Sequence, residues 1–124
     1  MLLPKEDAHI QSKELLLEQL CMLMGGRAAE NLCFDTITNG AAGDMSVARD
    51  ITTAMVCEWG MGTELYYEPK QPAAEAEINR ILKAVLAQAG DILKQHSIGV
   101  EKIERALLER ETLTGEEVRQ LLEP

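Results

Sequence analysis

Aromatic residues are scarce in this chain of 124 residues. They make up 3% of it, with one Trp, one Phe and two Tyr, although the whole hydrophobic class reaches 46%. The core must therefore be built from Leu, Ile, Val, Ala and Met, which suit helices packed on helices better than a sandwich of strands. We predict an all-α fold, a compact bundle of about five helices with at most a short extended segment. The length suits a single helical domain, 1–124.

Positive charge is scarce as well. Lys and Arg number 12 against 21 Asp and Glu, which gives a formal net charge of −9. Nucleic-acid surfaces need clustered positive charge, so nucleic acid is excluded as a partner, and anionic membranes are not favoured either. No apolar run reaches the length of a membrane span, and the N-terminus has no signal-peptide pattern.

The cysteines form no recognisable framework. Cys21, Cys33 and Cys57 lie in apolar helical contexts without CxxC spacing. An odd count without a framework indicates reduced thiols in a cytosolic setting. A zinc site made from these cysteines would require the fold to gather them, and buried thiols are the commoner outcome.

Apolar residues recur at helical spacing along most of the chain. Ser12 caps the first such segment, and Gly25-Gly26 interrupts it. Two glycines inside a helix cost about 2 kcal/mol relative to alanines. Because strong helix formers resume at Arg27, we predict one long helix with Gly25 and Gly26 at a close helix crossing; a break between two helices is the alternative. The predicted helices are 12–33, Met45 to near Trp59, Pro72 to a break at 96–99, 100–109, and 115–122 with a Thr114/Glu117 capping box, and residues 34–39 are predicted to be extended.

The stretch from Thr36 to Gly60 contains the most suggestive acid. A small, glycine-containing loop, Asn39–Gly43, leads directly to Asp44 at a predicted helix start. Its glycines permit positive φ and close approach of the backbone to another group. Asp is a good N-cap, and negative charge is favourable there. From the residues alone, capping is the commoner role for such an aspartate.

Self-sufficient catalytic motifs are missing. The sequence has no GxSxG, no phosphate-binding loop and no dinucleotide fingerprint. His9 and His96 are the only imidazoles, and they are far apart and unpaired with any obvious nucleophile.

Five segments in a fixed order nevertheless form a pattern. Together they closely resemble the C-terminal peptidase domain of FtsH-type proteases, the membrane-anchored AAA+ zinc metalloendopeptidases of bacteria, mitochondria and chloroplasts. The segments are LLPKED (2–7), GGRAAEN (25–31), TNGAAGD (38–44), MVCEWGMG (55–62) and ALLERETLTGEE (106–117).

The resemblance implies a specific metal site. In the family, two histidines of an HExxH helix hold zinc, the glutamate of that motif is the general base, and a loop aspartate is the third ligand. The matching aspartate is Asp44, and the loop that supports it contains Thr38, Gly40 and Gly43. Three protein ligands with an open water position are the usual arrangement of catalytic zinc.

The chain also departs from the family pattern. It contains no HExxH, so we expect these 124 residues to bind no zinc by themselves and to be inactive. Gly43 stands where the family commonly has a polar residue, and the segment from Tyr66 to Pro72 is shorter than usual.

The resemblance implies partners too. They are an upstream HExxH helix, an AAA+ ATPase module, further copies in a hexameric ring, and unfolded or membrane polypeptides as substrates. The implied location is the cytoplasmic side of a bacterial membrane or an organelle. The alternative is a non-catalytic relative of this peptidase domain that acts as a helical interaction module.

Overall fold

Six helices account for most of the residues that the computed structural model describes, which are 10–34, 39–110 and 113–123. No strand occurs in these ranges, so the all-α prediction is confirmed. Most of the predicted extended segment lies outside the described residues. The helices are α1 (Lys13–Leu23), α2 (Gly25–Phe34), α3 (Ala42–Cys57), α4 (Pro72–Lys94), α5 (Ser97–Arg110) and α6 (Gly115–Leu122).

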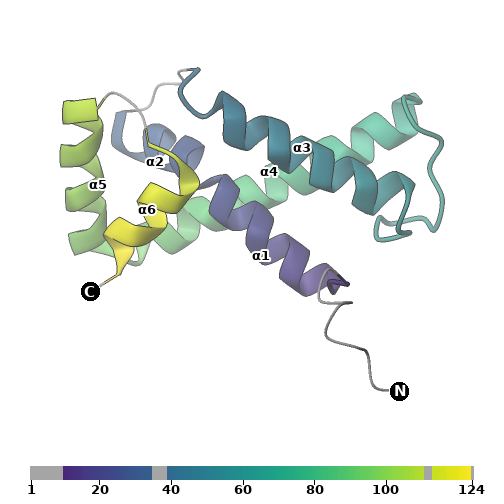
Figure 1. The fold of residues 1–124 in the computed structure, drawn as a ribbon, viewed down its shortest axis with the longest axis horizontal. Coiled ribbons are helices and arrows are strands. Elements are labelled where there is room, and N and C mark those ends of the chain that lie inside the picture. The colour runs from purple at the N-terminus through teal and green to yellow at the C-terminus, as the bar shows by residue number, and fades with distance from the viewer. Residues whose placement is uncertain (1–9, 35–38, 111–112, 124) are drawn as a thin grey trace.

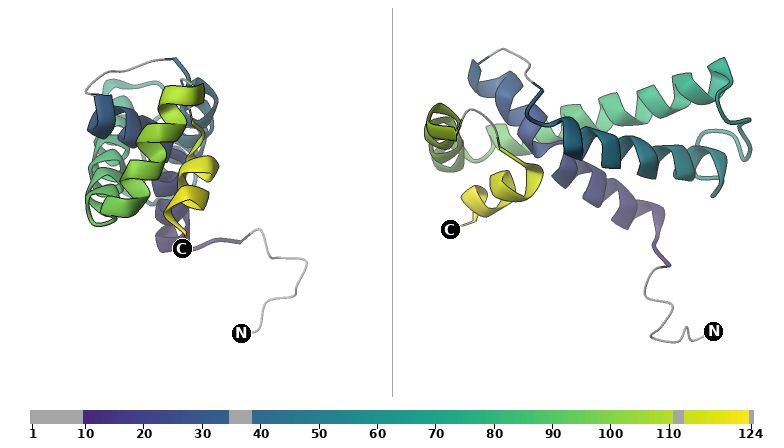
Figure 2. Two further views of the ribbon diagram at one scale, coloured as in Figure 1. Left: turned by 90° about the vertical axis from the view of Figure 1, so that its left-hand side faces the viewer. Right: turned by 45° about the horizontal axis from the view of Figure 1, so that its top comes forward.

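The longest helix, α4, organises the arrangement. Its 23 residues contact α1, α2, α3 and α5, and α6 packs on α1, α2 and α5. Figure 1 shows α5 and α6 at one end of the molecule and the loop between α3 and α4 at the other. The right-hand view in Figure 2 shows the same separation. The candidate metal-ligand segment at the start of α3 therefore lies toward the C-terminal helices.

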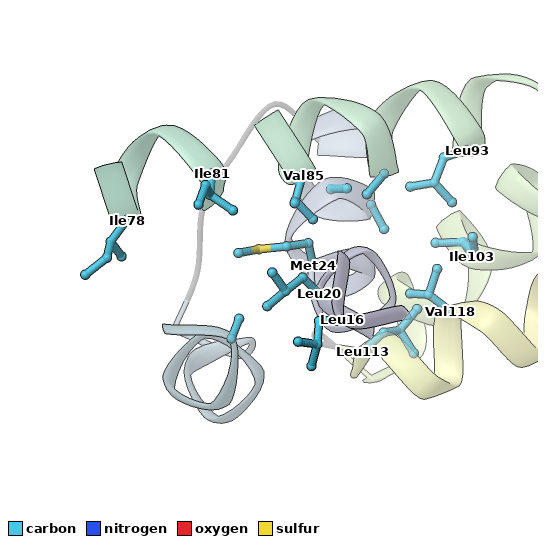
Figure 3. Close-up of a cluster of buried hydrophobic side chains, with 14 of the residues drawn as sticks. Leu16, Leu20, Met24, Ile78, Ile81, Val85, Leu93, Ile103, Leu113 and Val118 are labelled. Carbon is cyan, nitrogen blue, oxygen red and sulfur yellow. The ribbon is translucent and has the colours of Figure 1, made fainter. Parts of the chain in front are cut away.

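An aliphatic stripe on α4 forms one wall of the core. Ile78, Ile81 and Val85 recur at helical spacing and are buried in the core. The same core cluster contains Leu20 of α1 and Met24, which directly follows α1, and both are almost completely covered. In Figure 3 the side chains of Leu20 and Met24 lie below α4, beneath Val85. Each large aliphatic side chain buried in this way contributes about 2 kcal/mol. The same stripe continues to Leu93, which belongs to one core cluster with Ile103, Leu113 and Val118.

The prediction of one helix over 12–33 is wrong. The structure has two helices, with Met24 as the turn residue between α1 and α2. Hydrogen bonds from the Met24 amide to the Leu20 carbonyl and from the Ala28 amide to the Met24 carbonyl still bridge the junction. The alternative of a break at the glycines is therefore closer to the structure, and the break is one residue long.

Other predicted boundaries moved by a few residues. The α3 helix begins at Ala42 rather than Met45, and α5 begins at Ser97, so the break between α4 and α5 contains only Gln95 and His96. The predictions for α4 at Pro72 and for α6 over 115–122 are confirmed, including the capping box. Pro at a helix start and a capping box are among the most specific boundary signals in a sequence.

The loop between α3 and α4 is attached to α4 by one buried acid. Glu77 Oε2 accepts hydrogen bonds from the backbone N–H and the hydroxyl of Thr63, the latter at 2.8 Å. Arg80 donates from Nε to Oε1 at 2.7 Å. The hydrogen bond from Arg80, with those from Thr63, lowers the pKa of Glu77 to about 2. The ionised carboxylate therefore holds the loop in place.

This carboxylate makes the stability of the fold depend on pH. Because the pKa of Glu77 is lower in the folded state, its contribution is complete above the ordinary carboxyl pKa of 4.5 and is lost as pH falls toward about 2. We expect Glu77→Gln to lower the free energy of unfolding at pH 7, and the deficit to shrink between pH 4.5 and pH 2. Urea denaturation across this pH range checks the prediction. The exposed Glu101→Gln is the control, and an equal, pH-independent deficit in both variants would contradict it.

Gly26 and Gly90, both in helices, form a matched pair for testing the close backbone contact between α2 and the residues just before α6. A Cβ at Gly26 would lie 2.2 Å from the carbonyl oxygen of Leu113, whereas a Cβ at Gly90 would meet nothing within 4 Å. We expect Gly26→Ala to destabilise the fold by about 1–3 kcal/mol because backbone must move. Gly90→Ala should stabilise it by about 0.5–1 kcal/mol through helix propensity. Chemical denaturation measures both, and equal stability of the two variants would exclude a close crossing at Gly26.

Candidate functional site

Asp44 lies in the first turn of α3, not at its N-cap. The N-cap is Ala41, which makes no side-chain hydrogen bond to the helix, so the capping role considered for Asp44 is wrong. A carboxylate in the first turn is still favoured by the helix dipole. The side chain is half-buried, so it is neither a core residue nor a fully solvated one.

The Asp44 carboxylate is held by a distant part of the chain. Its Oδ2 accepts a hydrogen bond of 2.7 Å from the backbone N–H of Gly115, which lies 71 residues further on. Gly115 is the first residue of α6 and is buried. A carboxylate has two oxygens with about four acceptor positions, so this bond leaves capacity for a second partner.

The start of α6 that provides this donor is itself well ordered by hydrogen bonds. The Thr114 hydroxyl accepts from the Glu117 N–H at 3.2 Å, and Glu117 Oε1 accepts from the Thr114 N–H at 3.2 Å. The hydrogen bond from the Thr114 backbone lowers the pKa of Glu117, and Arg110 forms an ion pair with the same carboxylate. The capping box and Asp44 thus satisfy several amides that a helix start leaves without intrahelical partners.

The glycines of the preceding loop have ordinary backbone conformations. Gly40 is exposed and Gly43 lies in the first turn of α3, and neither has a positive φ. A Cβ at Gly43 would meet nothing within 4 Å, so this structure does not require glycine there. Thr38 lies outside the described residues.

Within the described residues, the other imidazole and thiol side chains form no metal-binding cluster with Asp44. His96 is exposed between α4 and α5, with Nδ1 2.8 Å from the carbonyl oxygen of Ile92, and His9 lies outside the described residues. Burial raises the pKa of the Cys21 and Cys33 thiols, which disfavours the thiolate that a metal binds. In the described part of the chain, no three His, Cys, Asp or Glu side chains gather as a metal site would require. Among the described residues, Asp44 is therefore not part of a three-ligand cluster.

A helix that crosses a lipid bilayer must be both long and apolar. Over the residues that the structure describes, no helix combines the length and the apolar character that crossing a membrane requires.

Gly115 is the site residue that sequence reasoning missed. The sequence does show that a helix starts there, because Thr114 and Glu117 form a recognisable capping box. It gives no sign that the first amide of this helix would meet an aspartate in α3. Contacts between residues so far apart in the chain follow from packing, which local patterns do not encode.

Comparison with known proteins agrees with the sequence pattern. The model of peptidase family M41 matches residues 1–71. The chain is 35% identical to the ATP-dependent zinc metalloprotease FtsH 1 of Methylacidiphilum infernorum, covering 98% of the chain and 22% of that protein. It is 32% identical to the ATP-dependent zinc metalloprotease FtsH of Thermotoga maritima, covering 97% of the chain and 23% of that protein.

A third relative, the ATP-dependent zinc metalloprotease FtsH of Caldicellulosiruptor bescii, is 34% identical over 98% of the chain and 24% of its own length. The chain thus spans about a quarter or less of these curated relatives. The alignments run over 143 or 145 positions, more than the 124 residues of the chain, so the relatives carry positions that it lacks. With more than half of its length matched by the family model, the chain belongs to peptidase family M41.

Proposed function

We propose that this chain works as part of an FtsH-type, ATP-dependent zinc metalloendopeptidase. In this role it supplies Asp44 as one ligand of the metal and a helical scaffold around it. The observation that carries the proposal is the fixed carboxylate at the start of α3, anchored through Oδ2 to the Gly115 amide. A half-buried acid with one oxygen engaged is well suited to offer the other oxygen to a cation.

The rest of the catalytic site would come from outside these residues. The sequence contains no HExxH, so the two imidazoles and the general base of the family would be provided by another segment, and the ATPase module and hexameric ring by further parts of the assembly. On this proposal the 124 residues alone are inactive, and the assembled enzyme cleaves unfolded or membrane polypeptides at the cytoplasmic side of a membrane or in an organelle.

A zinc titration tests the prediction that this chain has too few ligands to bind zinc tightly by itself. Calorimetry of the 124-residue chain with Zn²⁺ should show no tight, stoichiometric binding, because one carboxylate does not make a three-ligand site. One zinc bound tightly per chain would overturn this part of the proposal.

A graft tests the role of Asp44 itself. This chain can replace the matching segment of Thermotoga maritima FtsH, with which it shares 32% identity. We expect Asp44→Asn in the graft to weaken zinc binding more than about 100-fold, since loss of even an outer partner of a ligand costs about 10–100-fold. Equilibrium dialysis with metal analysis measures the affinity. The exposed Asp50→Asn in the same helix is the matched control, and equal zinc affinity of the two variants would exclude Asp44 as a ligand.

The alternative function is a non-catalytic helical interaction module. One observation favours it: the loop between α3 and α4 exposes 88% of Leu65 and 67% of Tyr66 while Glu77 holds the loop in place. Exposed apolar and aromatic side chains on a fixed loop are common in protein interfaces. A graft that binds no zinc even with Asp44 intact would support this alternative.

A further inference from the structure

Two glycines form reciprocal contacts where α6 meets the junction of α1 and α2. A Cβ at Gly26 would lie 2.2 Å from the carbonyl oxygen of Leu113, just before α6. In the other direction, a Cβ at Gly115 would lie 1.9 Å from the carbonyl oxygen of Met22. Real Cβ atoms do not approach other atoms so closely, so each position admits only a glycine without movement of the backbone.

Both contacts are made by backbone atoms. A flexible side chain could rotate away from an added methyl group, but a carbonyl in or beside a helix moves only with the chain around it. The start of α6 is therefore packed tightly, backbone against backbone, on the junction between α1 and α2. Val118 adds a side-chain contact, since a Cβ at Gly25 would lie 3.4 Å from it.

This close backbone contact fixes the direction of the Gly115 N–H. The Cβ position of Gly115 points at the carbonyl of Met22, 1.9 Å from its oxygen, and the Gly115 N–H donates to Asp44 Oδ2 at 2.7 Å. The glycine thus joins three helices: α6, to which it belongs, α1, which it touches, and α3, whose acid it holds. A carboxylate in the first turn of a helix can otherwise rotate about two side-chain bonds.

We propose that Gly115 is a positioning residue for Asp44. Its amide, held in place by the paired glycine contacts, selects one orientation of the carboxylate and leaves the second oxygen directed for another partner. This inference rests on the proposed function, in which that partner is the metal. The proposal gives the LTGEE segment (113–117) a second role besides starting α6.

The hydrogen bond is tested by amide exchange in the 124-residue chain labelled with ¹⁵N. Asp44→Ala removes the acceptor, and we expect exchange of the Gly115 amide to accelerate at least tenfold, while the core amides of Leu20 and Val85 keep their protection. Asp44→Asn keeps an acceptor oxygen and should restore most of the protection. Asp50→Ala, also in α3, is the control. Equal Gly115 exchange in Asp44→Ala and Asp50→Ala would overturn the proposal.

The positioning effect is tested at the start of α6, where Thr114 is exposed and can be substituted without changing the identity of Asp44 or Gly115. Thr114→Ala removes the capping hydroxyl, so the Gly115 amide should be less well fixed. We expect the three-bond couplings of the Asp44 β-protons to move toward rotamer-averaged values, and Thr114→Ser, which keeps a hydroxyl, to restore them. In the graft, Thr114→Ala should weaken zinc binding about tenfold. Unchanged Asp44 couplings in Thr114→Ala would contradict the positioning role.

The two proposals fail separately. If Asp44→Asn in the graft kept full zinc affinity, the ligand role would be wrong, and the exchange of the Gly115 amide would still report the hydrogen bond. If the exchange experiment failed while Asp44→Asn lost zinc, Asp44 would remain a ligand that another group orients.

Discussion

The backbone contact between α6 and the break at Met24 is the constraint on which the rest of the structure depends. It brings the C-terminal helix against the first two helices at a distance that only Gly26 and Gly115 permit. The side chains of Leu113 and Val118 then close the core beside α4 and α5. Because the same contact directs the Gly115 amide toward Asp44, packing of the core and orientation of the candidate ligand have one structural cause.

The core of the fold and the proposed metal ligand, Asp44, are held in place by different interactions. The core cluster is apolar and packs around α4, although the acids Glu30 and Glu77 are also buried, so most of its stability comes from burial of apolar surface. Asp44 lies at the edge of this core and contributes a polar link to α6. Small metal domains behave differently, since there the free energy of metal binding is the free energy of folding. In this chain the helices that position Asp44 can fold without the other groups of the proposed metal site.

Much of the fold could be predicted because its signals are local. Pro72 marks the start of α4, the Thr114/Glu117 box marks the start of α6, and the aliphatic stripe from Ile78 to Leu93 marks the buried face of α4. Resemblance to FtsH-type proteases, not spacing, singled out Asp44 as a ligand. The break at Met24 and the hydrogen bond to Gly115 could not be predicted, because both depend on which helices meet in space. The Gly25-Gly26 pair indicated a special position but did not distinguish a break between two helices from a close helix crossing. The structure contains both, a break at Met24 and a close contact at Gly26.

The half-buried acid Asp44 and the buried acid Glu77 show why charge alone does not identify a site. Glu77 is more buried, and hydrogen bonds from Arg80 and Thr63 satisfy it and lower its pKa to about 2. Such a carboxylate is committed to structure, since binding a cation would cost it those partners. Asp44 has a backbone donor on Oδ2, and within the described residues it forms no ion pair with a cationic side chain. An acid that is oriented but not neutralised is the better candidate for holding a metal, and this difference in partners, rather than burial, favours Asp44.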